Sequence, residues 1–217
     1  MAASSTRPSQ CALPYLAAAA GGAAIATIGV KLFRYLSGNR RSMALQVVDI
    51  DIKGRTDEDL IRESVMIARK AVNKGNHPFG ALLVHVPSRR IIATAENTVV
   101  TEKDTTGHAE TNLIRIATKK FSRERLGECA LYTSTEPCCM CAGAIYWAGI
   151  KRVVYGCSDT ALYKISAPKP HDPALRLSSR TVFSKAQGSR VEVKGPVEEG
   201  FCREIHAEFW PKYTGEC

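Results

Sequence analysis

The first 48 residues of this 217-residue chain contain no acidic side chain. They carry five basic residues, whereas the rest of the chain has 25 basic and 21 acidic residues and is nearly balanced. A compact nucleic-acid-binding domain usually concentrates its basic surplus in its folded part. The net charge of +9 therefore belongs mostly to the N-terminal end, and it argues against nucleic acid as a partner.

Internal repeats are also lacking, as are low-complexity tracts after residue 43, which excludes a repeat architecture. A hydrophobic content of 45% and a charged content of 24% are typical of one globular domain with an appendage. We therefore expect an N-terminal leader over residues 1–42 and a single domain over residues 43–217.

The leader lacks any charge between residues 8 and 30, a length that matches a bilayer-spanning helix of about 20 residues. Alanine and glycine dominate the stretch, so its hydrophobicity is marginal. Basic residues follow it, and the positive-inside tendency would leave the domain on the cytosolic side. Three alternatives stay open: membrane attachment through residues 11–33, a cleaved organelle-targeting segment, or a disordered tail. The expected location is the cytoplasmic face of a membrane or an organelle interior.

The cysteines lack the paired spacing of a disulfide scaffold. Five of the eight are scattered: Cys11, Cys129, Cys157, Cys202 and Cys217. The other three are crowded into one turn, as the paired thiolates of a metal site would be. Because thiolate ligands persist under reducing conditions, we expect a reducing compartment.

Two short motifs carry the chemistry of the chain. The first is His108-Ala109-Glu110, and the second is Pro137-Cys138-Cys139-Met140-Cys141. Together they offer one imidazole and two thiolates, with a carboxylate beside them. A structural zinc site uses four protein ligands, whereas a catalytic site uses three and leaves the fourth position to water. The pattern predicts a hydrolase with one zinc ion per chain.

The hydrophobic pattern predicts an alternation of helices and strands. The expected strands cover residues 80–86, 91–95, 129–133, 152–155 and 190–193. The expected helices cover residues 56–72, 108–120, 140–147 and 197–210. Residues 158–189 are polar and interrupted by proline, so we expect them to form mostly loop. This order favours an α/β fold, a three-layer α/β/α sandwich around a mixed sheet of about five strands.

Both motifs fall at predicted helix starts. Pro137 suits such a position, because its missing N–H is not needed there. A helix N-terminus favours negative charge and so stabilises the thiolates of Cys138 and Cys141. Bound zinc would lower the pKa of its water toward 7, and Glu110 is near enough to move that water's proton. A closed structural zinc module, with Cys139 or Cys157 as fourth ligand, is the non-enzymatic alternative.

The motif H-x-E with P-C-x-x-C is the signature of zinc-dependent nucleobase deaminases. The segment over residues 57–156 resembles the cytidine and deoxycytidylate deaminase-like superfamily. Residues 76–81, 108–110 and 136–145 are most similar to its guanine deaminase and nucleoside deaminase branch. The resemblance implies that zinc is bound by His108, Cys138 and Cys141, and that Glu110 shuttles protons.

The resemblance also implies a set of substrate contacts. Asn97 matches an asparagine that recognises the base, and an acidic contact is implied at Asp159. Three further residues match positions that line the substrate pocket: Phe79, Ala109 and Trp147. Family members commonly form homodimers, and a C-terminal segment can close the site of its own chain or of a partner.

The function implied is hydrolytic deamination of a small nucleobase or nucleoside, first of all guanine to xanthine with release of ammonia. Two alternatives use the same zinc chemistry. One is a tRNA wobble-adenosine deaminase, which would need a basic surface for the phosphates. The other is a cytosine or cytidine deaminase, which would differ only in pocket shape.

Overall fold

A six-stranded mixed sheet forms the centre of the protein, in the order β1-β3-β2-β4-β5-β6. The computed structural model describes residues 46–166, 175–188 and 190–213. The strands are β1 (Gln46–Asp51), β2 (Gly80–His85), β3 (Arg90–Glu96), β4 (Cys129–Thr135), β5 (Arg152–Cys157) and β6 (Glu192–Lys194). The first four in spatial order pair antiparallel, whereas β4, β5 and β6 run parallel to one another.

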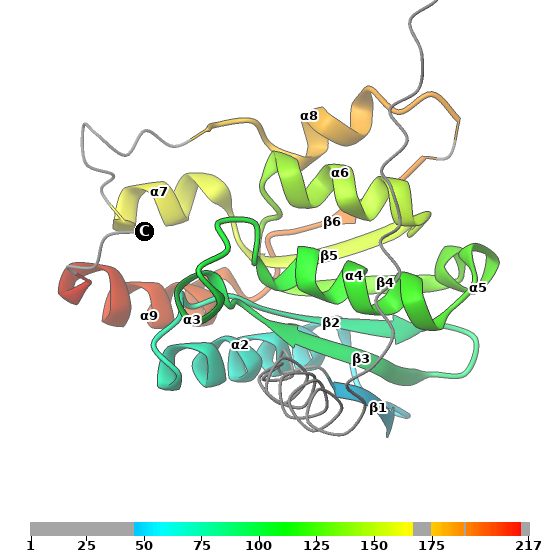
Figure 1. Ribbon diagram of the computed structural model, residues 1–217, viewed down its shortest axis with the longest axis horizontal. Coiled ribbons are helices and arrows are strands. Elements are labelled where there is room, and N and C mark those ends of the chain that lie inside the picture. Colours follow the sequence, from blue (N-terminus) through cyan, green and yellow to red (C-terminus); the bar gives the residue numbers. More distant parts are fainter. Residues whose placement is uncertain (1–45, 167–174, 189, 214–217) are drawn as a thin grey trace, which may run out of the picture. The chain divides into compact units, whose positions relative to one another are not determined.

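Helices cover both faces of this sheet (Figure 1). They are α2 (Asp57–Asn73), α3 (Val99–Glu102), α4 (Ala109–Lys120), α5 (Arg123–Gly127), α6 (Cys139–Ala148), α7 (Asp159–Ser166), α8 (Ser179–Ser184) and α9 (Glu199–Phe209). A short 3₁₀ helix, η1 (Trp210–Lys212), follows α9. The α/β/α sandwich expected from the sequence is confirmed.

Each face of the sheet has its own hydrophobic core. One core joins α4, α6 and α8 to side chains such as Leu83 and Leu131. The other joins α2 and α9 to the opposite side chains of the same strands, such as Leu82 and Tyr132. Alternation along each strand produces this division, because successive side chains point to opposite faces.

The start of α2 shows how closely local sequence sets an element boundary. The Thr56 hydroxyl accepts a hydrogen bond from the Asp59 N–H at 3.3 Å, and the Asp59 carboxylate accepts one from the Thr56 N–H at 2.9 Å. This reciprocal pair is a capping box. Gly80 then begins β2 so close to α2 that a Cβ atom would collide with the α2 backbone at Ser64 and Ala68.

The parallel pairing of β4 and β5 brings two chain segments to one edge of the sheet. Thr135 at the end of β4 pairs with Cys157 at the end of β5. The chain continues from β4 into Pro137 and α6, and from β5 into α7. The second motif and the start of α7 therefore lie side by side.

The structure adds elements that the sequence pattern did not reveal. The sheet has six strands where about five were expected, because β1 adds an edge strand. Its Val47 and Ile50 are 50% and 42% exposed, so no buried face marks the strand in the sequence. Within residues 158–189, expected to form mostly loop, the described part contains the helices α7 and α8. Helix α7 has no fully buried side chain, and α8 has only six residues.

The expectations for residues 1–42, including membrane attachment through residues 11–33, lie outside the described residues. Within the described ranges, no helix combines the length and apolar character needed to cross a bilayer.

Candidate functional site

The N-terminus of α4 carries the first motif. His108 is the N-cap residue of α4 with an extended backbone, and Glu110 lies in the first turn. The loop that leads into the helix is tied to the end of β3. The Gly107 carbonyl accepts hydrogen bonds from the Thr98 N–H at 2.9 Å and from the Asn112 amide at 3.2 Å. The position of His108 is therefore set by both the helix and the neighbouring strand.

The N-terminus of α6 carries the second motif. Cys138 is the N-cap residue, and Cys141 lies one turn further on. Both sulfurs lie 3.6 Å from Nδ1 of His108, and the three ligand atoms are all within 4.8 Å of one another. Tetrahedral zinc ligands at about 2.0–2.3 Å from the metal lie roughly 3.5 Å apart. The two motifs thus meet at the spacing that zinc requires.

The ligand group has three members in the part of the chain that the structure describes. Among the described residues, one cluster of three or more His, Cys, Asp or Glu side chains could hold a metal ion, and it consists of His108, Cys138 and Cys141. Cys139 and Cys157 do not belong to it. A site with three protein ligands keeps one position for water, as catalytic zinc sites do. The donor set therefore fits a catalytic zinc ion.

The two thiols of this group are electrostatically different. A hydrogen bond from the Cys141 thiol, together with His108, lowers the pKa of Cys138 to about 4. The same bond and burial raise the pKa of Cys141. The Thr111 hydroxyl lies 3.3 Å from the Cys141 sulfur and opposes that rise. Because zinc binds thiolates, the contacts prepare Cys138 for a metal, whereas Cys141 would lose its proton when a metal binds.

Glu110 lies beside the ligands in a fully enclosed position. Only 5% of its surface is exposed, and its Oε1 accepts a hydrogen bond from the Thr133 hydroxyl at 2.9 Å. Burial is the main cause of a raised pKa for this carboxyl, and the charge of Cys138 adds to it. A carboxyl that holds a proton more readily than usual is suited to general acid–base chemistry.

Asn97 follows β3 and packs beside the loop that leads to His108. Its Oδ1 accepts a hydrogen bond from the Val99 N–H at 3.1 Å. Its side chain is fully buried, yet Nδ2 has no hydrogen-bond partner among the described residues. Buried amide groups without a partner are rare, and a ligand is one way to satisfy them.

The three residues expected to line the pocket have different positions. Ala109 is the first residue of α4 and is fully buried. Phe79 is half-buried, with its ring 5.4 Å from that of His206. Trp147 is 74% exposed at the C-terminal end of α6, the end opposite to the zinc ligands. At about 1.5 Å per residue, the nine residues from Cys138 to Trp147 span roughly 13 Å. Within one chain, Trp147 therefore does not line the site, contrary to the expectation.

Asp159, the expected acidic contact, is the first residue of α7. Burial and the Glu136 carboxylate raise the pKa of Asp159, and the charge of Cys138 also contributes. The Arg176 guanidinium is 3.9 Å away and opposes the rise. The Asp159 backbone N–H donates a hydrogen bond to Oε2 of Glu136 at 3.2 Å.

Sequence reasoning missed several polar residues that support the site. Thr111 contacts a ligand sulfur, Thr133 contacts Glu110, and Glu136 binds the start of α7. Asn112 holds the loop before His108. A signal existed for Thr111 and Asn112, because both are polar residues at positions of α4 that face inward. The spacing of Thr133 and Glu136 carries no comparable signal.

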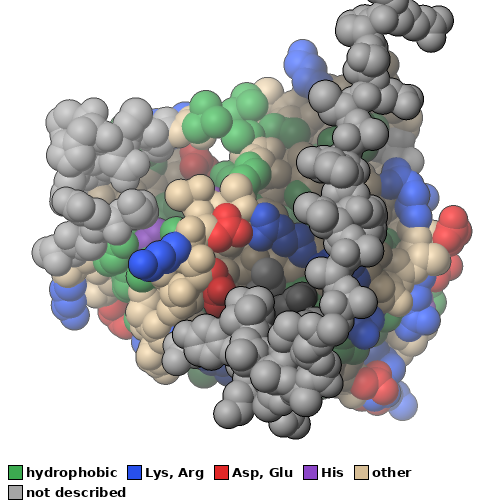
Figure 2. All heavy atoms as spheres, in the orientation of Figure 1, with side chains coloured by type: hydrophobic (Ala, Val, Ile, Leu, Met, Phe, Trp, Pro, Cys, Tyr) green, Lys and Arg blue, Asp and Glu red, His purple; other side chains and the backbone are tan. Residues whose placement is uncertain are grey.

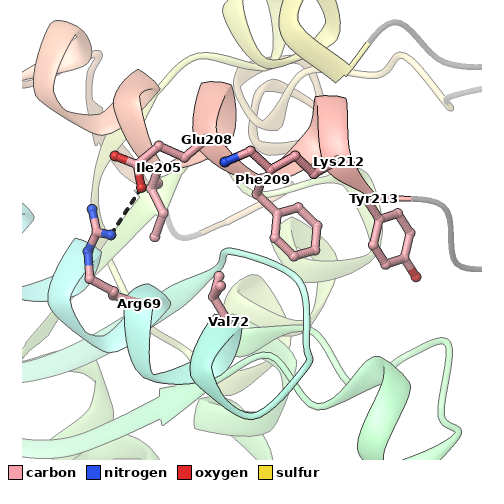
Figure 3. Close-up of a pocket in the computed structure, with 7 residues that line it drawn as sticks. All are labelled: Arg69, Val72, Ile205, Glu208, Phe209, Lys212 and Tyr213. Carbon is pink, nitrogen blue, oxygen red and sulfur yellow. Dashed lines mark hydrogen bonds and ion pairs between the residues drawn. The ribbon is translucent and has the colours of Figure 1, made fainter.

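A separate hollow of about 360 Å³ lies between α2 and the C-terminal helices (Figure 3). Val72, Ile205 and Phe209 supply apolar lining, and Arg69 and Glu208 form an ion pair at 3.1 Å at its rim. None of its lining residues belongs to the two motifs, so this hollow is distinct from the candidate zinc site.

Figure 2 shows basic and acidic side chains interspersed over the described part of one face of the molecule, without a continuous basic stripe there. This agrees with the near balance of charge after residue 48. A phosphate backbone would favour a contiguous basic surface.

Residues 54–157 match the family model described as the cytidine and deoxycytidylate deaminase zinc-binding region. A probable cytosine deaminase of Schizosaccharomyces pombe is 38% identical over 157 residues, which cover 71% of this chain and 94% of the relative. A guanine deaminase of Bacillus subtilis is 45% identical over 104 residues, which cover 48% of this chain and 65% of the relative.

One solved structure comes from studies of A-to-I editing by tRNA:A34 deaminases. It superposes with a TM-score of 0.54 at 33% identity, covering 67% of this chain and 97% of that one. These relatives are all named as deaminases but differ in the substrates that their names state. The agreement of motif, ligand geometry and family match leads to one conclusion: the chain belongs to the zinc-binding cytidine and deoxycytidylate deaminase family.

Proposed function

We propose that the protein deaminates a free nucleobase hydrolytically, and that guanine is the substrate, converted with water to xanthine and ammonia. The observation that carries this proposal is the enclosed Glu110 carboxyl beside one imidazole and two thiols, ligand types that a catalytic zinc ion uses. The guanine deaminase of Bacillus subtilis, 45% identical over the shared 104 residues, supports the choice of base.

His108, Cys138 and Cys141 would hold the zinc ion. When bound, zinc lowers the pKa of a water molecule and so supplies a nucleophile at neutral pH. Glu110 accepts a proton from the attacking water and delivers it to the ring nitrogen beside the reacting carbon. A second proton transfer by the same carboxyl lets the amino group leave as ammonia. The hydrogen bond from Thr133 keeps Oε1 of Glu110 in place through both transfers.

Asn97 and Asp159 would orient the base. The unpartnered Nδ2 of Asn97 is a donor for a ring nitrogen or carbonyl oxygen of the substrate. The Asp159 carboxylate is an acceptor for a ring N–H. Guanine offers both kinds of group, with acceptors at O6, N3 and N7 and donors at N1 and N9.

Cytosine is the second candidate, because the Schizosaccharomyces pombe relative is matched over 94% of its length. Cytosine also presents one acceptor and one N–H at suitable positions, and it needs a smaller pocket. The tRNA substrate is disfavoured by the charge balance of residues 49–217.

These alternatives can be tested by measuring ammonia release by the zinc-loaded protein. The substrates to compare are guanine, cytosine, adenine, their nucleosides and a tRNA with adenosine at position 34. We expect guanine to have the highest kcat/KM. Turnover of cytosine alone would replace guanine by the second candidate, and inosine formation in tRNA would replace both.

We also propose that two copies of the chain pair as a homodimer. Trp147 and Tyr146 stack edge to face with ring centroids 5.4 Å apart, and Trp147 is mostly exposed. Large exposed aromatic side chains are enriched at protein interfaces. Light scattering of the native protein and of Trp147→Glu checks this, because the substitution should shift the mass toward that of one chain.

A further inference from the structure

Glu136 directly precedes the second motif, and no step of the proposed chemistry uses its side chain. It stands between the end of β4 and Pro137, two residues before the ligand Cys138. Its Oε1 accepts hydrogen bonds from the Ser179 hydroxyl at 2.8 Å and the Ser179 N–H at 3.2 Å. Its Oε2 accepts one from the Asp159 N–H at 3.2 Å. One carboxylate thus ties the starts of α7 and α8 to the zinc motif.

The start of α7 is held from its other side by a second carboxylate. Oε1 of Glu199, the first residue of α9, accepts hydrogen bonds from the Ser158 hydroxyl at 2.5 Å and the Ser158 N–H at 3.1 Å. The Ser158 hydroxyl in turn accepts from the Ala161 N–H at 3.2 Å. Since α7 itself has no fully buried side chain, these polar contacts contribute much of what fixes its first turn.

We propose that Glu136 is a positioning residue for substrate selection: it holds Asp159 at the distance from the zinc ligands at which the Asp159 carboxylate meets the base. This inference rests on the proposed function, in which Asp159 contacts the substrate. In this role Glu136 acts through Asp159 and contacts neither the zinc ion nor the base itself.

The chemistry of the contacts requires a carboxylate at this position. All three groups that face Glu136 are donors, namely two N–H groups and one hydroxyl. A carboxylate has acceptors only and satisfies all of them. A glutamine of the same shape would direct its NH₂ group at either Asp159 or Ser179, so that two donors would oppose each other. Glu136→Gln therefore disturbs the contact with little change of volume.

The test compares Glu136→Gln, Asp159→Ala and the double variant in the zinc-loaded, full-length protein, with guanine and cytosine as substrates. For Glu136→Gln we expect kcat/KM to fall about 10-fold, mainly through KM, as for a lost hydrogen bond to a charged group. Zinc content should stay at one per chain. In the Asp159→Ala background, Glu136→Gln should change kcat/KM less than 2-fold, because its effect passes through Asp159.

Two matched controls accompany these variants. Glu204→Gln makes the same chemical change at an exposed position of α9 and should leave kcat/KM unchanged. Ser179→Ala removes only the hydroxyl bond to Glu136 and should have a smaller effect than Glu136→Gln. Independent losses of kcat/KM in the double variant, loss of zinc from Glu136→Gln, or an unchanged KM would overturn the proposal.

Hydrogen exchange separates this inference from the proposed function. Glu136→Gln should speed amide exchange in residues 158–166 and 178–184 without any substrate present. If the wild-type protein deaminates none of the bases, the proposed function fails, and faster exchange still supports the anchoring of α7. If exchange is unchanged, Glu136 does not position this segment, whatever base the enzyme accepts.

Discussion

Two regions border the candidate site, and they are built in different ways. The metal region, residues 97–148, contains the three zinc ligands and Glu110, all within two helix starts. The wall region, the described part of residues 158–213, contains Asp159 and His206. It is joined to the end of β4 by contacts between residues that are far apart in the sequence. Thr135 binds His206 across 71 residues, and Glu136 binds Ser179 across 43. The reaction chemistry is thus encoded locally, whereas the surroundings of the substrate depend on tertiary contacts.

This comparison predicts that changes in the metal region abolish turnover of every base. The largest effect is expected for Cys141→Ser, because a buried serine hydroxyl is a poor zinc ligand. Zinc content, measured by atomic emission, should fall far below one per chain, and ammonia release should fall to background. Chelation of zinc from the wild-type protein should have the same effect and be reversed by added zinc. Full activity with an empty site would contradict the assignment of the ligands.

Glu110→Gln separates the two functions of the metal region, which are zinc binding and proton transfer. It removes the proton carrier but keeps the ligands, so kcat should fall by about 10²–10⁴-fold, the usual contribution of general acid–base catalysis. Zinc should remain bound at one per chain. Unchanged turnover would instead indicate that the zinc ion is structural.

His206 provides a test of the wall region through stability. It is fully buried, accepts a hydrogen bond from the Trp210 indole at Nδ1 and lies 2.8 Å from the Thr135 hydroxyl at Nε2. Since Nδ1 accepts, the Nε2 proton is donated to Thr135, and the imidazole is neutral. Burial lowers the pKa of His206 to about 4.

The unfolded chain takes up a proton on this histidine below about pH 6.5, whereas the folded protein does so only below about pH 4. The free energy of unfolding should therefore fall as the pH decreases from about 6.5 to 4, by about 3 kcal/mol in total. Urea unfolding of wild type and His206→Gln over this range should show a shallower decrease for the variant. Any loss of zinc in acid affects both proteins, so equal slopes would contradict the buried neutral state.

The smallest effect is expected for a contact within the metal region. Thr111→Val keeps the shape of the side chain but removes the hydroxyl at 3.3 Å from the Cys141 sulfur. Zinc affinity, measured by competition with a chromophoric chelator, should fall about 10-fold, as for other groups that support a metal ligand. Thr111→Ser keeps the hydroxyl and should bind zinc as the wild type does. Equal affinity of the valine and serine variants would show that this hydrogen bond is unimportant.

Much of the fold could be predicted from hydrophobic periodicity. Strands β2 to β5 and helices α2, α4, α6 and α9 are long enough and sufficiently buried for their patterns to be legible. The edge strand β1 and helix α7 were missed because their exposed side chains leave no clear alternation. Trp147 was expected in the pocket on the basis of family resemblance, but its place at the far end of α6 exposes it.

By itself, the sequence determined the candidate zinc ligands and the proposed proton carrier of this protein. His108 and Glu110 begin one helix and Cys138 and Cys141 begin another, so short-range spacing suffices to set their roles. Only the tertiary structure decided what surrounds them. The contacts of Glu136 with α7 and α8, and of His206 with Thr135, depend on the parallel register of β4 and β5 and on the packing of α9. Local spacing cannot specify such contacts, because their partners meet only after the sheet has formed.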